Sequence, residues 1–148
     1  MDTSLKFRSV ILKFSRMLSD EINTLLLEHQ LNYSLWQVLH YIQQHQPCTS
    51  TEIAEYLNIS RPSIAKRIQP LLKLQAVSQH SEADRRVRIL RLTDSGQQLV
   101  IQCMDKIDQL EQELLEQSCD TDIQLSIKLI HQLTQQLQHK KSGVHHEH

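Results

Sequence analysis

Basic side chains gather in the middle of this chain. Residues 60–92 contain eight lysines and arginines but only two acidic residues, a net charge of +6; the basic ones are Arg61, Lys66, Arg67, Lys73, Arg85, Arg86, Arg88 and Arg91. An arginine can hold a phosphate or a guanine edge with two hydrogen bonds, and a lysine adds a positive point charge. This segment is therefore a candidate binding surface for a polyanion.

The net charge of the whole chain does not reveal this basic segment. The formal net charge of the 148 residues is −1, which by itself indicates neither a nucleic-acid binder nor an enzyme for acidic substrates. Residues 93–122, however, carry one lysine against eight acidic residues, a net charge of −7. The chain joins a basic segment to an acidic one, and we expect the acidic segment to be repelled from any polyanion that the basic one binds.

An aromatic group precedes the basic segment. Tyr33, Trp36, His40 and Tyr41 lie close together in the sequence and could line a ligand cleft. Aromatic residues at such spacing more often belong to a core, so both interpretations stay open.

The cysteines indicate a reduced protein. Cys48, Cys103 and Cys119 form no CxxC pair, so neither a disulfide framework nor a cysteine-rich zinc site is predicted. Cys103 falls on an apolar stripe and is expected to be buried and inert. Cys48 lies beside Pro47 in a predicted loop and is the better candidate for a redox-sensing thiol, although an inert cysteine is the commoner case.

The sequence gives little support for a metal site or an enzyme active site. His29, His40 and His45 lack a paired i, i+4 ligand spacing, and the histidines of residues 145–148 lie in a tail without fixed geometry, so we predict no metal and no other cofactor. The chain has no GxSxG, no HExxH and no glycine-rich phosphate loop, and it contains only two glycines. We therefore expect a protein that is not an enzyme.

Apolar spacing predicts helices ahead of the basic segment. Apolar residues at steps of three and four predict one helix over 5–27. Ser34 and Gln37 have the spacing of a capping box for a second helix, which ends before Pro47.

A tight pair of helices follows. Thr49 and Glu52 again have capping-box spacing, here for a helix of two or three turns, and Asn58 suits the left-handed backbone of a sharp turn. Ser60 can cap the next helix, with Pro62 tolerated in its first turn.

This last helix, which we expect to reach about Leu74, has one apolar and one basic face. Ile64, Ile68 and Leu71 face inward. The remaining arc is polar and basic, and it carries Arg61, Ser63, Lys66 and Arg67.

Strand-like spacing replaces the helical period over 77–93. The segment predicts a hairpin whose loop spans 81–86. Thr93 then caps a helix to about Ser118, and a second long helix begins at Asp120. Residues 140–148 have no periodicity and are predicted to be disordered.

Composition agrees with a mainly α protein. Two glycines and three prolines leave little turn chemistry for a sandwich or barrel.

The length suits one domain, or one domain with a dimerisation element. With no apolar run long enough for a membrane span and no signal peptide, we expect a cytoplasmic protein without a membrane partner.

Two motifs carry a resemblance to a known family. The segments STEIAEYLNISRPSIAKRIQPLLKLQAV and DRRVRILRLTDSG resemble the MarR family of bacterial transcriptional regulators. The DxR motif of residues 84–86, followed by LTDSG, is the more specific part. Gln75 departs from the glycine that the family usually has before the first wing strand, and Pro70 is also unusual.

The resemblance implies a winged helix-turn-helix with long N- and C-terminal helices that form a dimerisation region. Residues 31–93 would bind DNA, and residues 1–30 and 94–139 would form the dimer. In the major groove the resemblance implies contacts from Ser60, Arg61, Ser63, Ala65, Lys66 and Arg67. In the minor groove it implies a wing with Arg85, Arg86 and Arg88, in which Asp84 orients Arg86.

The resemblance also implies how such a protein works. A homodimer would bind double-stranded DNA at an inverted repeat, and a small-molecule effector, such as an aromatic acid in the cleft lined by the aromatic group, would relieve repression. Two alternatives stay open: a regulator of the same fold that senses oxidants through Cys48, and a winged-helix module that binds only proteins.

Overall fold

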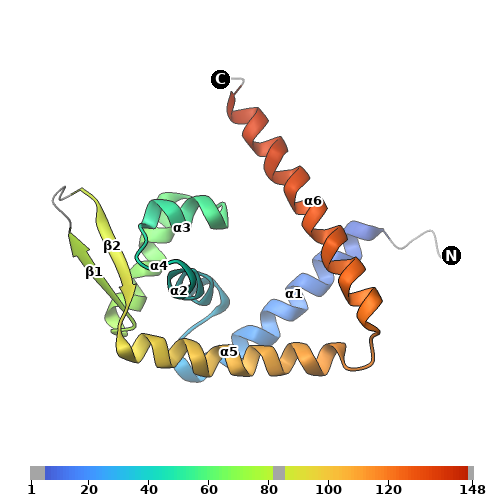
Figure 1. Cartoon of the computed structure of the whole chain (residues 1–148), viewed down its shortest axis with the longest axis horizontal. Coiled ribbons are helices and arrows are strands. Elements are labelled where there is room, and N and C mark those ends of the chain that lie inside the picture. Colours follow the sequence, from blue (N-terminus) through green and yellow to red (C-terminus); the bar gives the residue numbers. More distant parts are fainter. Residues whose placement is uncertain (1–5, 82–85, 147–148) are drawn as a thin grey trace. The chain divides into compact units, whose positions relative to one another are not determined.

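The computed structural model describes residues 6–81 and 86–146, and in this part the chain is mainly helical with one two-stranded sheet (Figure 1). The elements follow in the order α1 (Phe7–Leu26), the 3-10 helix η1 (Leu27–His29), α2 (Tyr33–His45), α3 (Ser50–Leu57), α4 (Arg61–Lys73), β1 (Val77–Ser81), β2 (Arg88–Leu92), α5 (Asp94–Leu115) and α6 (Asp120–His146). The predicted mainly α class is confirmed.

The chain divides into two compact units, residues 1–108 and 109–148, with the division inside α5. The first unit holds α1 to β2 and most of α5, and the second holds the end of α5 and all of α6. Within the described residues, no helix combines the length and apolar character needed to cross a membrane.

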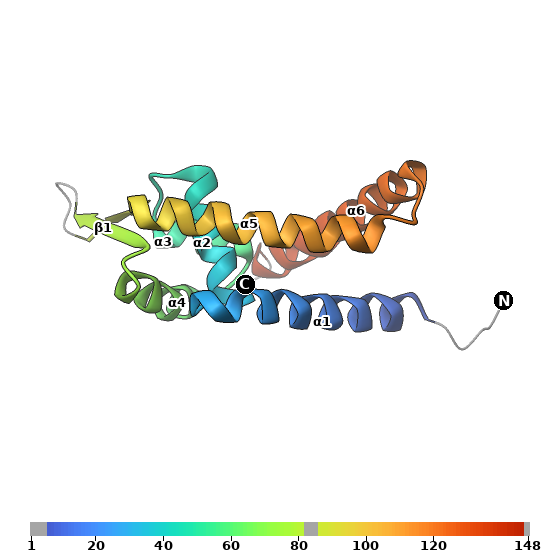
Figure 2. The same cartoon turned by 90° about the horizontal axis from the view of Figure 1, so that it is seen from below.

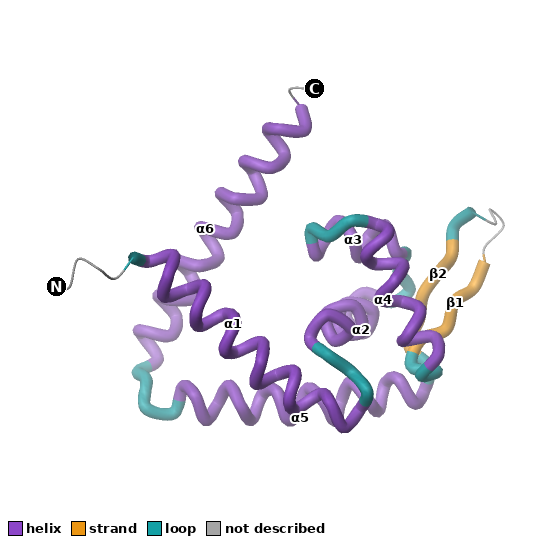
Figure 3. Tube along the Cα trace, turned by 180° about the vertical axis from the view of Figure 1, so that it is seen from behind, coloured by secondary structure: helices purple, strands orange, loops and turns teal. Residues whose placement is uncertain are grey.

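The core of the first unit lies where α2, α3 and α4 pack together beside the hairpin (Figure 3). Its fully buried apolar side chains come from all these elements: Val38, Leu39, Ile42, Ile53, Ile64, Leu71 and Leu90. The inward face predicted for α4, with Ile64, Ile68 and Leu71, is thereby confirmed. Burial of each large side chain stabilises the fold by about 1.5–3 kcal/mol.

The turn between α3 and α4 follows from its capping residues. The Thr49 side chain accepts from the Glu52 N–H while the Glu52 carboxylate accepts from the Thr49 N–H, which is the predicted capping box. Asn58 ends α3 with φ 58° in the left-handed region, and the Ser60 hydroxyl accepts from the Ser63 N–H at 3.3 Å. These contacts turn the chain sharply and begin α4 at Arg61.

The N-terminus of α2 differs from the prediction. Ser34 does not cap this helix, because it already lies in the first turn. Asn32 is the N-cap, and its Oδ1 accepts from the Leu35 N–H at 2.8 Å. Asn23 of α1 accepts from the Tyr33 N–H at 2.7 Å, so the preceding helix also contributes to the cap.

The predicted hairpin is present, and a third segment joins it. β1 and β2 pair antiparallel with Val77 opposite Leu92, and the pair extends away from the helices (Figure 2). Cys48 forms an antiparallel bridge with Leu90, through N–H···O bonds of 3.2 and 2.7 Å. This bridge was not predicted, because one residue of extended backbone has no detectable period.

The junction between α4 and β1 accounts for the LTDSG motif. Gln75 has φ 59°, a conformation that favours glycine, and its carbonyl accepts from the Thr93 hydroxyl at 2.5 Å and the Ser95 hydroxyl at 3.0 Å. A Cβ added to Gly96 would lie 1.9 Å from the Ala76 carbonyl oxygen. Glycine is therefore required at residue 96, whereas Gln75 occupies its position at the cost of backbone strain.

The α6 helix extends into the C-terminal tail that the sequence predicts to be disordered. The α6 helix continues to His146, so residues 140–146 are helical; residues 147–148 lie outside the described part. A helical backbone satisfies its own hydrogen bonds and needs no apolar period on every turn.

Candidate nucleic-acid interface and effector cavity

The N-terminal half of α4 presents the polar arc that the sequence predicts. Ser60, Arg61, Ala65 and Lys66 are exposed, and Ser63 is half-buried with its hydroxyl 2.9 Å from that of Ser60. The opposite face of the helix is fixed in the core by Ile64 and Ile68, so its orientation is determined by packing. The outward face combines a helix N-terminus, hydroxyl groups and two cations.

Arg67 is less exposed than the sequence predicts, and its contact with DNA stays a prediction. Its side chain is half-buried, and its Nη1 donates to the Ser34 carbonyl oxygen at 3.3 Å and to Gln37 Oε1 at 3.2 Å. Both acceptors belong to α2. Arg67 therefore joins α4 to α2, a role that spacing within one helix could not indicate.

The other arginines predicted to bind DNA belong to the hairpin. Arg86, Arg88 and Arg91 are exposed, and Arg88 Nη1 donates to Gln79 Oε1 across the two strands at 3.3 Å. Asp84 and Arg85 lie outside the described residues. β1 packs against α4 and pairs with β2, so the basic strand belongs to the same packed group of elements as α4.

Two of these features suit duplex DNA. An α-helix fits the major groove, where arginine and lysine can contact guanine edges and a helix N-terminus favours a phosphate oxygen. An exposed basic hairpin can follow the adjacent backbone or minor groove.

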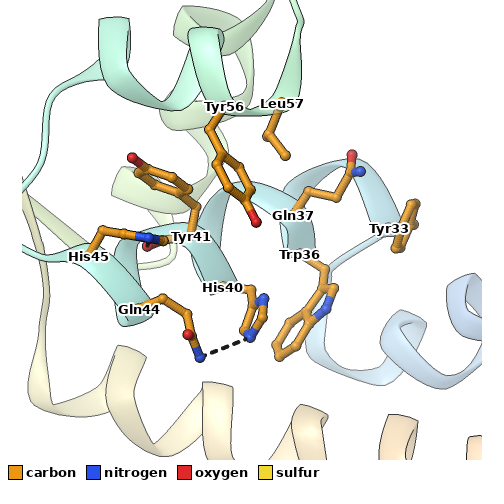
Figure 4. Close-up of a pocket in the computed structure, with 9 residues that line it drawn as sticks. All are labelled: Tyr33, Trp36, Gln37, His40, Tyr41, Gln44, His45, Tyr56 and Leu57. Carbon is orange, nitrogen blue, oxygen red and sulfur yellow. Dashed lines mark hydrogen bonds between the residues drawn. The ribbon is translucent and has the colours of Figure 1, made fainter. Parts of the chain in front are cut away.

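The predicted aromatic group lines a cavity between α2 and α3 (Figure 4). The cavity has a volume of about 220 Å³, and Tyr33, Trp36, His40 and Tyr41 all line it. Sequence reasoning missed five further lining residues: Gln37, Gln44, His45, Tyr56 and Leu57. Those on α2 repeat at helical spacing with the predicted four, whereas Tyr56 and Leu57 are brought close only by the packing of α3.

The rings of the cavity form two stacked pairs. Trp36 stacks on His40 with ring centroids 5.5 Å apart, and Tyr41 stacks on His45 at 4.2 Å. Tyr56 descends from α3 and tilts against Tyr41 at 4.9 Å. Gln44 Nε2 lies 3.4 Å from His40 Nε2.

Burial and nearby acidic groups alter the titration of this cluster. Burial and the neighbouring His45 lower the pKa of His40, which Asp108 partly opposes. Burial raises the pKa of Tyr41, and Cys48, Glu52, Tyr56 and Glu55 add to that effect. Both side chains are therefore neutral at pH 7.

The cysteines divide into buried and exposed thiols. Cys48 is 1% exposed, and burial, with a smaller contribution from Glu52, raises the pKa of its thiol to about 11. A buried thiol with so little thiolate favours the inert interpretation, and the redox role of Cys48 stays an alternative hypothesis. Cys103 is also buried with its pKa raised to about 11, and the exposed cysteine is Cys119.

No metal centre emerges from the described residues. Among the side chains that the structure describes, no three from His, Cys, Asp or Glu come together in a way that could hold a metal ion.

Comparison with known proteins shows a similarity to one family of regulators. A sequence model of the MarR family matches residues 29–87, which span α2 through the hairpin loop. Over these residues the chain is similar to the MarR family. An uncharacterized HTH-type transcriptional regulator of Staphylococcus aureus is 31% identical over 93 residues, 62% of this chain and 63% of the relative. The chain thus matches less than two thirds of that relative's length.

A second relative matches over a longer region. The uncharacterized HTH-type transcriptional regulator YwoH of Bacillus subtilis is 27% identical over 122 residues, which cover 82% of this chain and 89% of the relative.

Solved structures establish the fold. Staphylococcus aureus MarR, solved in complex with salicylate and kanamycin, superposes with a TM-score of 0.82 at 23% identity and covers 88% of this chain and 89% of that one. A complex of Staphylococcus aureus MepR with DNA has a TM-score of 0.80 at 21% identity and covers 88% of this chain and 98% of that one. The predicted winged helix-turn-helix fold is thereby confirmed.

Proposed function

We propose that this protein is a homodimeric transcriptional regulator that binds an inverted repeat in double-stranded DNA and represses transcription until a small molecule occupies the aromatic cavity. The observation that carries the DNA-binding part is the exposed face of α4, where Arg61 and Lys66 extend from a capped N-terminus while the opposite face is buried. An ordinary core helix would not present that face beside a basic hairpin.

In this proposal α4 enters the major groove and the wing meets the adjacent minor groove. Arg61, Lys66 and the hydroxyls of Ser60 and Ser63 contact bases or phosphates there. Arg86 and Arg88 provide the charge of the wing, with Arg85 and its orienting partner Asp84 as further predicted members.

The dimer is supported by apolar side chains that the single chain leaves exposed. Those on α1 are Phe7, Val10, Leu12, Phe14 and Met17, and those on α6 are Leu125, Ile127, Leu129, Ile130 and Leu137. A symmetric partner would remove such surface from water and would place two copies of α4 about 10 bp apart on the duplex.

A titration of duplex DNA by fluorescence anisotropy tests the DNA-binding part. Fragments selected from the source genome should bind about 10³-fold more tightly than random duplex. Arg61→Ala and Arg86→Ala should each weaken binding, and the loss of a phosphate contact should reduce the dependence of log K on log salt by about 0.9. Lys73→Ala removes the same charge from the last turn of α4 and serves as the control.

Two results would contradict specific parts of the proposal. An unchanged affinity and salt dependence for Arg86→Ala would exclude the wing contact. If no genomic fragment binds better than random DNA, the protein-interaction alternative is favoured instead.

A further inference from the structure

The cavity between α2 and α3 has walls suited to positive charge. Of its nine lining residues, Tyr33, Trp36, Tyr41 and Tyr56 present aromatic rings, whose faces attract cations. None of the nine is a lysine or an arginine, and the two lining histidines are His40 and His45.

Two helix ends add to this preference. Tyr41, Gln44 and His45 come from the last turns of α2, and Tyr56 and Leu57 come from the last turn of α3. The C-terminal end of a helix carries about half a negative charge, which favours cations within its last turn. Tyr56 lies against both Tyr41 and His45, with ring centroids 4.9 and 5.7 Å apart (Figure 4).

Nearby acidic side chains also favour a cation. Glu52 and Glu55 of α3 act electrostatically on Tyr41, and Asp108 of α5 acts on His40. Arg67 is the basic side chain that reaches the lining, through its bond to Gln37 Oε1, but its Nη1 also donates to the Ser34 carbonyl oxygen. An anionic ligand would therefore meet acidic groups and helix C-termini without a lysine or arginine in the lining.

We propose that this cavity selects a small aromatic cation, such as an aromatic quaternary ammonium, in place of the aromatic acid expected from the family resemblance. This inference rests on the regulator proposed above and names the effector class for its cavity. The volume of about 220 Å³ suits a molecule with one aromatic ring. Tyr56, which is 64% exposed, forms a wall that solvent reaches, so a ligand can enter beside it.

Trp36 provides a direct readout, because it is the only tryptophan of the chain and it lines the cavity. Its fluorescence is titrated with benzyltrimethylammonium, with benzyl alcohol as the neutral probe and with benzoate as the anionic one. We expect the cation to bind at least about tenfold more tightly than benzoate. Equal or tighter binding of benzoate, or no response to any of the three probes, would overturn the proposal.

Charge substitutions at Gln44 test whether the cavity prefers a positively charged ligand. Gln44→Lys should weaken binding of the cation by about tenfold, and Gln44→Glu should strengthen it. Gln43→Lys adds the same charge at the neighbouring position outside the lining, so it should have a smaller effect. Equal effects of the two lysine variants would mean that the cavity is not the binding site.

Ring substitutions test the aromatic contact. Tyr56→Leu should weaken binding of the cation by about fivefold. Tyr56→Phe keeps the aromatic face and should bind the cation as tightly as the wild type does. Loss of benzoate binding in Arg67→Gln, with the cation unaffected, would identify an anion site and contradict the proposal.

DNA binding of the same preparations separates the two proposals. If sequence-specific DNA binding is intact and the cation does not bind, only the effector class is wrong. If the cation binds and specific DNA binding is absent, the proposed regulator is wrong while the cavity chemistry stands.

Discussion

At the residue scale, single positions decide whether the wing can pack on the helices. Gly96 allows the backbone of α5 to approach Ala76, because any Cβ would overlap the Ala76 carbonyl. Gln75 shows the opposite case, since it tolerates a left-handed backbone while its carbonyl receives two hydroxyl hydrogen bonds. Those bonds stabilise the junction despite the missing glycine.

Gly96→Ala should therefore lower the free energy of unfolding by several kcal/mol, because a 1.9 Å contact with backbone can be relieved only by moving β1 or α5. Urea unfolding followed by circular dichroism measures the change. Gln98→Ala, an exposed position on the same helix, is the control and should stay within about 0.5 kcal/mol of the wild type. Similar stabilities of the two variants would mean that the close approach of Gly96 does not constrain the junction.

At the scale of elements, α2 connects the two proposed activities. One part of it binds Arg67 of the DNA-facing helix through Ser34 and Gln37, and Gln37 also lines the cavity. A ligand that moves Gln37 would thus disturb the helix that the proposal places in the major groove. This contact offers a physical link between effector and DNA.

Arg67→Ala should lower the free energy of unfolding by about 1–3 kcal/mol, because the variant loses two hydrogen bonds made by a charged donor. Lys66→Ala removes an exposed charge from the next position and should change stability by less than about 0.5 kcal/mol. Chemical denaturation of both variants is the measurement. If both lose the same stability, Arg67 does not act as the link between α4 and α2.

At the scale of the whole molecule, the exposed apolar side chains of α1 and α6 and the separation of charge along the chain support one assembly. A dimer would cover the apolar side chains, and the basic α4 and β2 would meet DNA while the acidic residues of 93–122 are repelled by it. The effector cavity lies within the first unit, so each protomer carries one.

Phe14→Glu should shift the protein from dimer toward monomer, because it places a charge among the exposed apolar residues of α1. In the proposed dimer Phe14 would be buried on both protomers. Its loss should lower the free energy of dimerisation by about 3 kcal/mol or more, which raises the dimer Kd by about 100-fold. Sedimentation velocity over a concentration series measures it. Ser15→Glu adds the same charge at an exposed polar neighbour and should leave the dimer intact; a monomeric wild type would exclude the homodimer.

The sequence by itself determined the features that depend on neighbours along the chain. The helical spacing of α4, the capping box of Thr49 and Glu52, the left-handed Asn58 and the alternation of the hairpin are local, so their residues predict them directly. The candidate basic face and the four aromatic residues of α2 were found in the same way.

Only the tertiary structure decided the contacts between distant segments. It buried Cys48 against Leu90, bonded Arg67 to α2 and brought Tyr56 of α3 against Tyr41. It also extended α6 through a tail without apolar period. Each of these depends on how elements pack or on backbone hydrogen bonding alone, and the free energy of such contacts leaves no periodic trace in the order of the residues.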